Sequence, residues 1–135
     1  MTKILLVDDS KFLRLAAERA LARAGYEVIS ATDGEKALRM AQDELPDLIL
    51  MDILLPKMSG RDVLVALKKD PSTQAIPVVV MTGLSQRNAA RLQEDGAIAF
   101  LEKSALDLDK GSEKLLDAVQ EILKKLPERT RTTTA

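Results

Sequence analysis

Histidine and cysteine are absent from this sequence of 135 residues, and aromatic residues make up only 2% of it. Without cysteine the chain forms no disulfide and no thiolate metal site. Without histidine it has no His-based catalytic triad, no His-ligated zinc and no phosphohistidine of its own. Any metal site must therefore use oxygen ligands. The lack of cysteine also suits a reducing compartment, and we expect a cytoplasmic protein.

A strong charge imbalance and a long apolar run are lacking as well. The formal net charge is −1, which removes the usual electrostatic case for binding nucleic acid or anionic membranes. The first apolar run, Ile4–Val7, stops at Asp8 and is too short for a signal peptide. No segment approaches the roughly 20 apolar residues that span a bilayer. We therefore expect no nucleic-acid and no membrane partner.

What the sequence does contain is an alternation of short apolar runs with helical patterns. Hydrophobic residues make up 46% and charged residues 30%, which is typical of a soluble globular domain. The alternation predicts β-α-β units and a parallel sheet covered by helices. We expect one (βα)5 domain over residues 1–126 and a short disordered tail over residues 127–135. The expected strands are Ile4–Val7, Glu27–Ala31, Leu48–Met51, Ile76–Met81 and Ile98–Leu101.

Capping residues and apolar spacing place five helices between and after these strands. The second helix should follow the turn Asp33-Gly34, bury Ala37, Met40 or Ala41, and Leu45, and end at Pro46. The other four are predicted at Ser10–Gly25, Gly60–Lys69, Ser85–Glu94 and Ser112–Leu126.

Charged and hydroxyl side chains follow the strands at one edge of the predicted sheet. Asp52 ends the apolar stretch that begins after Asp47, and the carboxyl ends of parallel strands are where such folds bind ligands. Each residue alone has a plain structural interpretation, such as a solvated loop carboxylate or a pair near a helix N-terminus. The set that should converge there is Asp8-Asp9, Asp52, Thr82-Gly83 and Glu102-Lys103.

Such a cluster needs a cation. Two carboxylates 4 Å apart repel by about 4 kcal/mol at an effective dielectric near 20. Oxygen ligands favour Mg²⁺ or Mn²⁺ over zinc or copper. A carboxylate beside a divalent ion and an ammonium is also a plausible nucleophile for phosphoryl transfer, with a hydroxyl donating to the transferring group. The product would be an acyl phosphate on an aspartate.

These residues resemble the receiver domains of two-component response regulators, over about Lys3 to Leu126. The matching positions are Val7-Asp8-Asp9-Ser10, Met51-Asp52, Pro56, Gly60, Met81-Thr82-Gly83, Phe100 and Lys103. The resemblance implies a flavodoxin-like, doubly wound fold with strand order 2-1-3-4-5, the order known for chemotaxis receivers, and helices on both faces.

The resemblance also implies a role for each matching residue. Asp52 would be the phospho-acceptor, and Thr82 and Lys103 would contact the phosphoryl group. Asp9 and Asp52 would bind Mg²⁺ (or Mn²⁺) directly, Asp8 through water, and Leu54 through its main-chain carbonyl. Phe100 would be an aromatic switch whose rotamer follows Thr82, although an aromatic residue that ends a strand is often plain core.

The partners implied are a sensor histidine kinase or a histidine phosphotransfer protein, and an unknown downstream protein. Because we see no output domain after Leu126, we expect a stand-alone receiver, monomeric or dimerising on phosphorylation. Its output would be protein contact through the fourth helix, fifth strand and fifth helix, here Gln86, Arg87, Ala90, Arg91, Phe100 and Ser104.

Three positions bear on how the chain departs from its relatives. Ser104 stands where the family usually has a proline in a cis peptide, and cis before a non-proline residue costs about 3 kcal/mol. The stretch 105–111 also looks longer than usual.

Leu54 and Leu84 flank the site and are both apolar, so neither can orient an attacking water. We therefore hypothesise slow self-dephosphorylation.

Four alternatives stay open. The chain could be a phosphorelay intermediate, or a degenerate receiver that acts as an adaptor without phosphorylation. A haloacid-dehalogenase-type phosphatase needs an acid two residues after the nucleophile, where this chain has Leu54. A flavodoxin-like electron carrier is disfavoured because Asp8-Asp9 would repel a phosphate and the three aromatic residues are badly placed for a flavin.

Overall fold

Five parallel strands form the centre of the computed structural model, which describes residues 2–53, 55–82, 94–102 and 113–126. They lie in the order β2-β1-β3-β4-β5, which confirms the predicted doubly wound α/β fold. Their bounds fall within two residues of those predicted from the sequence. The strands are β1 (Lys3–Val7), β2 (Glu27–Ala31), β3 (Leu48–Asp52), β4 (Val78–Thr82) and β5 (Ala99–Glu102).

The central strand β3 is buried along its whole length. Its side chains alternate between the two faces of the sheet, as the two-residue period of a strand requires. Ile49 and Met51 join one core cluster, and Leu48 and Leu50 join the other. An uninterrupted apolar run is therefore needed at this position, because neither face of the strand meets water.

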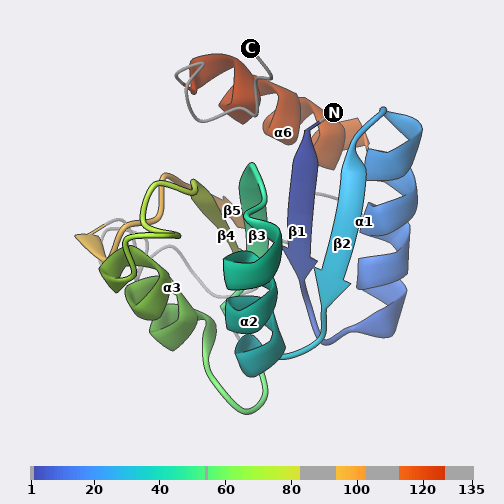
Figure 1. Ribbon diagram of the computed structural model, residues 1–135. Helices are drawn as coiled ribbons and strands as arrows, with labels where there is room; N and C mark the ends of the chain where they lie inside the picture. Colours follow the sequence, from blue (N-terminus) through green and yellow to red (C-terminus); the bar gives the residue numbers. More distant parts are fainter. Residues whose placement is uncertain (1, 54, 83–93, 103–112, 127–135) are drawn as a thin grey trace.

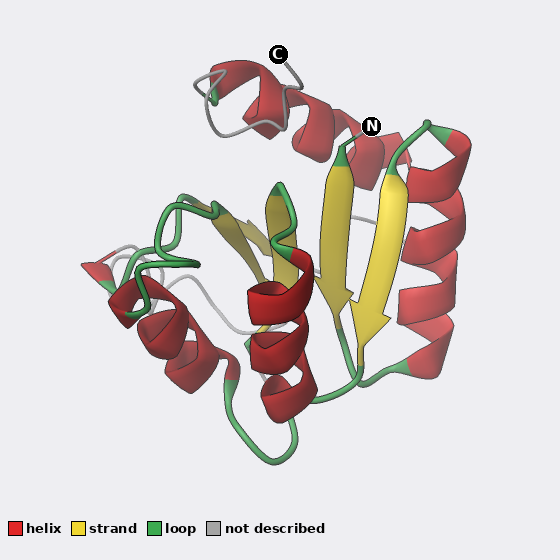
Figure 2. Ribbon diagram, viewed as in Figure 1, coloured by secondary structure: helices red, strands yellow, loops and turns green. Residues whose placement is uncertain are grey.

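Helices cover both faces of the sheet. Figures 1 and 2 show α2 (Gly34–Glu44) and α3 (Gly60–Lys69) on one face, and α1 (Lys11–Arg23) and α6 (Glu113–Lys125) on the other. The apolar stripes of these helices build the two core clusters. Among the residues described, no helix is long and apolar enough to cross a membrane. The helix expected at Ser85–Glu94 lies almost wholly outside the described residues.

Side-chain caps fix where three of these helices begin. The Ser10 and Ser59 hydroxyls accept hydrogen bonds from the main-chain amides of Leu13 and Asp62, and an Asp33 carboxylate oxygen accepts one from the amide of Lys36. Each bond satisfies an amide that has no partner within its helix. The caps of α1 and α2 lie within three residues of the ends of β1 and β2, whereas a longer loop separates β3 from α3.

Leu45 corrects one prediction. We expected its side chain on the buried stripe of the second helix, but α2 ends at Glu44 and Leu45 is its C-cap, with a φ of 46°. The left-handed backbone turns the side chain out of the helical stripe, and Leu45 is 53% exposed. Ala37 and Ala41 form the buried face of the helix instead. The three-to-four-residue spacing of apolar residues does not show at which residue a helix ends.

Candidate functional site

Three aspartates meet at the carboxyl edge of the sheet. Asp8 and Asp9 follow β1, and Asp52 is the last residue of the neighbouring strand β3. Each offers one carboxylate oxygen, and these oxygens lie within 4.8 Å of one another. Asp8 and Asp52 are buried and Asp9 is exposed. The predicted convergence of these three carboxylates is therefore present in the structure.

Asp8 is held by main-chain and side-chain contacts. Its amide donates to the carbonyl of Ala31 in β2 at 3.2 Å, and its Oδ1 accepts from the amide of Ser10 at 2.9 Å. Its own carbonyl accepts from Nη1 of Arg14 at 3.2 Å. Arg14 lies one turn into α1, and its Nε is 3.8 Å from a carboxylate oxygen of Glu18. These contacts fix the β1–α1 connection.

Asp52 is held by the pairing of its strand and by the loop that follows. It pairs with Met81 in β4, and the amide of Ile53 donates to the carbonyl of Met81 at 3.1 Å. The loop returns at Gly60, whose amide donates to the carbonyl of Ile53 at 2.9 Å. A Cβ at Gly60 would lie 2.6 Å from the main-chain oxygen of Asp52. Glycine is therefore required where α3 starts against the end of β3.

The donor set fits a hard divalent cation. Three carboxylate oxygens this close repel one another, and a cation between them removes that repulsion. The described part of the chain offers only oxygen here, which is the ligand type that Mg²⁺ and Mn²⁺ prefer. Two ligands are buried and one is exposed, so an ion would reach the cluster from the Asp9 side and keep waters there, as Mg²⁺ usually does.

The other predicted site residues are placed in part. Thr82 is the last residue of β4 and pairs with Glu102, so its main chain lies at the same edge as Asp52. Phe100 lies within β5 beside Val80 rather than at the end of the strand, and it packs half-buried against the core cluster on the α2–α3 face. The structure does not test its role as a switch. Leu54, Leu84, Lys103 and Ser104 lie outside the described residues.

A contact missed by sequence reasoning joins the start of α2 to the loop after Asp52. The amide of Gly34 donates to the carbonyl of Pro56 at 3.4 Å, and Nζ of Lys57 lies 3.9 Å from Oδ2 of Asp33. Lys57 itself has a φ of 67°. The Asp33-Gly34 pair was interpreted only as a turn before a helix, because nothing in the local pattern shows what packs against it.

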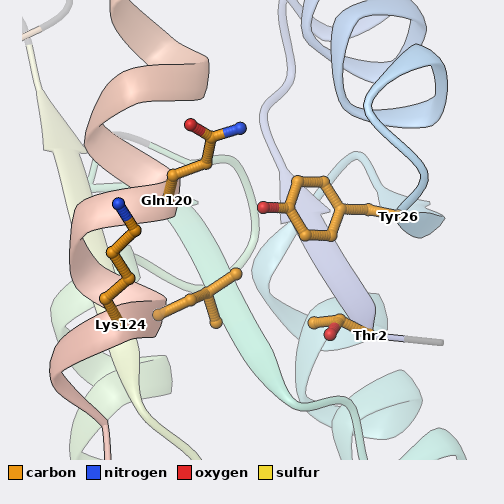
Figure 3. Close-up of a pocket in the computed structure, with 5 residues that line it drawn as sticks. Thr2, Tyr26, Gln120 and Lys124 are labelled. Carbon is orange, nitrogen blue, oxygen red and sulfur yellow. The ribbon is translucent and has the colours of Figure 1, made fainter.

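A small cavity of about 230 Å³ lies at the opposite edge of the sheet. Thr2 precedes β1 and Tyr26 precedes β2, while Gln120, Leu123 and Lys124 line the cavity from α6. Figure 3 shows the Tyr26 hydroxyl pointing across it toward α6. Burial raises the pKa of Tyr26 above its ordinary value. The cavity is far from the aspartates, because the amino and carboxyl ends of parallel strands lie at opposite edges.

Fold and site together define a doubly wound α/β protein with an acidic, cation-type site at the carboxyl edge of its sheet. Residues 4–120 match the family of response regulator receiver domains. The chain belongs to that family, the signalling module of two-component systems, in which phosphoaspartate and Mg²⁺ binding are typical. The resemblance noted in the sequence is thereby confirmed.

Known proteins related to the chain carry this domain in different settings. The "Response regulator PleD" of Caulobacter vibrioides is 44% identical over 108 residues, which are 78% of this chain and 24% of that protein. The chain thus spans about a quarter of the length of that relative. The solved structure of the chemotaxis response regulator CheY4 of Vibrio cholerae is 31% identical, with a TM-score of 0.80 over 90% of this chain and 98% of CheY4.

A third similarity is to a receiver domain that is part of a kinase. The structure of the signal receiver domain of a signal transduction histidine kinase from Syntrophus aciditrophicus is 32% identical, with a TM-score of 0.80 over 100% of this chain and 98% of that one. Receivers from three differently named proteins are thus similar to this chain to comparable degrees. The two solved structures share the fold of this chain, so the fold does not assign a pathway.

Proposed function

We propose that this chain accepts a phosphoryl group on Asp52 and signals through contacts that depend on that modification. The observation that carries the proposal is the convergence of Asp8, Asp9 and Asp52 within 4.8 Å, at the edge of the sheet where this fold places its chemistry. Asp52 is the member of the cluster at the end of β3, which is buried along its whole length. Its main chain is held on both sides, by β4 and by Gly60, which suits a nucleophile that must keep its position.

The proposed reaction is a transfer between two protein side chains. A carboxylate oxygen of Asp52 attacks the phosphorus of a phosphohistidine on a sensor kinase or a phosphotransfer protein. The new O–P bond forms as the P–N bond breaks, and the electron pair of that bond returns to the histidine ring. When bound by Asp8, Asp9 and Asp52, Mg²⁺ would neutralise charge on the transferring group. Thr82 and Lys103 are proposed to contact its oxygens.

The remaining aspartates have separate parts in this proposal. Asp9 is exposed and offers one carboxylate oxygen to the cluster. Asp8 is buried, and its Oδ1 accepts a hydrogen bond from the Ser10 amide. We propose that Asp9 and Asp52 bind the ion directly and Asp8 through water. Leu54 is proposed to add its main-chain carbonyl.

The output is proposed to be protein contact in the cytoplasm, without nucleic acid. Phosphorylation would shift an equilibrium between an inactive and an active arrangement. The face proposed for the partner includes β5, where Phe100 lies half-buried. A phosphorelay intermediate differs only in passing the group on to another histidine. Incubating the phosphorylated chain with a phosphotransfer protein separates the two, because a relay intermediate loses its label to that protein.

The experiment that tests the proposal is intact-mass measurement after incubation with acetyl phosphate and Mg²⁺. Wild type should gain one phosphoryl group, Asp52→Ala should gain none, and chelation of the metal should abolish the gain. Asp43→Ala is the matched control, since Asp43 is an exposed aspartate in α2 and outside the site. It should gain the group as wild type does.

Each other outcome has a defined meaning. A gain that survives Asp52→Ala would place the acceptor elsewhere and overturn the assignment. A folded wild type that binds Mg²⁺ and gains nothing would favour the degenerate receiver. That result would direct attention to the segment around Ser104.

A further inference from the structure

The first turn of α2 lies against the loop that leaves the proposed phospho-acceptor. That loop runs from Ile53 to Ser59, between Asp52 and the start of α3. Figure 1 shows residues 55–59 of this loop at the carboxyl edge of the sheet, beside the first turn of α2. No sequence motif joins the two segments, because β3 and the end of α2 separate them along the chain.

Gly34 makes the closest of these contacts. A Cβ built at Gly34 would lie 2.0 Å from the main-chain oxygen of Met58, and 2.8 Å from both its carbonyl carbon and its Cβ. Two of these three atoms belong to the backbone, so a side-chain rotation cannot relieve the overlap. The loop would have to move instead.

A movement of this loop would displace Asp52, because both ends of the loop contact that residue or the residue after it. At one end the loop begins directly after Asp52. At the other, the amide of Gly60 donates to the carbonyl of Ile53, and Gly60 lies against the main-chain oxygen of Asp52. A loop displaced from α2 would therefore pull on the segment that carries the acceptor carboxylate.

We propose that Gly34 is a positioning residue for the cation and phospho-acceptor site, acting through the loop 53–59. The inference rests on the proposed function, because it assigns Gly34 a part in the same site. Gly34 touches no reacting atom. Because Gly34 has no side chain, the loop can pack against α2, and this contact sets the position of Asp52 relative to Asp8 and Asp9.

Helix propensity predicts the opposite effect for a substitution here. Gly34 is the first residue of α2, and its φ lies outside the left-handed region. Alanine is a better helix former than glycine, so Gly34→Ala taken alone should strengthen the helix. Any loss of Mg²⁺ affinity in that variant must then come from the overlap with Met58.

Gly25→Ala is the matched control. Gly25 also lies at a helix end, but its φ of 99° strains any other residue, and nothing lies within 4 Å of its Cβ position. It precedes β2 at the opposite edge of the sheet. Gly25→Ala should therefore lower the stability of the protein without changing the site.

The test is the Mg²⁺ dissociation constant of the full chain, measured by titration calorimetry. Gly34→Ala should raise it about tenfold or more, the usual cost of disturbing groups that support metal ligands. Gly25→Ala should match wild type despite its lower melting temperature. Equal affinity in Gly34→Ala and wild type would overturn the inference. Failure of wild type to bind Mg²⁺ would overturn the proposed function instead.

A second measurement covers the case in which Gly34→Ala does not fold. Amide hydrogen exchange in wild type reports the Gly34 amide, which donates to Pro56 in the loop, and the Gly25 amide, which donates to Ala22. Linkage is reciprocal, so if α2 supports the site, Mg²⁺ must slow exchange at Gly34. Exchange at Gly25 should not change. An unchanged rate at Gly34 with Mg²⁺ bound would overturn the inference.

Discussion

The amide of Ser10 donates a 2.9 Å hydrogen bond to Oδ1 of Asp8, so one carboxylate serves both the turn into α1 and the proposed cation site. Ser10 in turn caps α1 by accepting from the amide of Leu13. Asp8 therefore has two roles. Its Oδ1 accepts the hydrogen bond that stabilises the turn, and its negative charge is proposed to attract the cation.

Two substitutions separate these duties. Asp8→Asn keeps an acceptor for Ser10 and removes the charge, whereas Asp8→Ala removes both. When a chelator has removed Mg²⁺, Asp8→Ala should be less stable than Asp8→Asn by about 1–3 kcal/mol, because the Ser10 amide then lacks its hydrogen-bond acceptor. Both variants should lose most of the stabilisation that Mg²⁺ gives wild type. Urea unfolding with and without Mg²⁺ measures both effects, and equal stability of the two variants would contradict this division.

Leu45 offers a test of local backbone strain away from the site. It adopts a φ of 46° and is largely exposed, so glycine should fit better there. Leu45→Gly should raise the free energy of unfolding by about 1 kcal/mol. The left-handed conformation costs residues other than glycine about 1–2 kcal/mol, and the larger backbone entropy that glycine loses on folding offsets part of this gain. Leu45→Ala keeps the strain and should show no gain. Urea denaturation compares the three proteins, and a loss in Leu45→Gly would contradict the interpretation.

The Tyr26 hydroxyl should ionise at a higher pH than an ordinary tyrosine does. Burial raises its pKa above the ordinary 10.0, so the unfolded chain ionises this group at a lower pH than the folded protein does. Unfolding then releases a proton between the two pKa values, and stability falls as the pH rises through that window. Tyr26 is the only tyrosine and the chain has no tryptophan, so near-ultraviolet absorbance follows this single group. A midpoint at or below 10.0 in the folded protein would contradict the expected shift.

The lifetime of the phosphorylated protein tests the two apolar positions beside the site. Leu54 and Leu84 carry no group that can orient an attacking water, and we expect slow loss of the phosphoryl group. The double variant Leu54→Asn with Leu84→Glu supplies such groups and should shorten the lifetime. Phosphate release after removal of the phosphodonor measures it. A lifetime shortened little or not at all would count against the hypothesis.

Much of the fold could be predicted from the sequence because its signals are local. The run Leu48–Met51 forms a strand buried on both faces, and α3 spans Gly60–Lys69 as expected, with Ser59 as its N-cap. The predicted burial of Leu45 was wrong because the apolar spacing of α2 continues past the residue where the helix ends. Phe100 lies within β5, as it does in the strand expected at Ile98–Leu101.

The site could be predicted only as far as strand ends determine it. Asp8, Asp9 and Asp52 meet because parallel strands end at one edge. The supporting contacts could not be predicted in the same way. Arg14 on the carbonyl of Asp8, and Gly34 against Met58, join segments that are separate in the sequence, and their distances depend on how the finished helices pack.

The most direct test of the central claim is to locate the phosphoryl group chemically. Borohydride reduces an aspartyl phosphate to homoserine, and tryptic digestion then places the new residue by tandem mass spectrometry. The peptide over residues 40–57 contains Asp43, Asp47 and Asp52, so it resolves the acceptor from two neighbours of the same type. We predict homoserine at position 52 alone, and only when Mg²⁺ is present during phosphorylation. Homoserine at position 8, 9, 43 or 47, or none in a protein that carries the added mass, would contradict it.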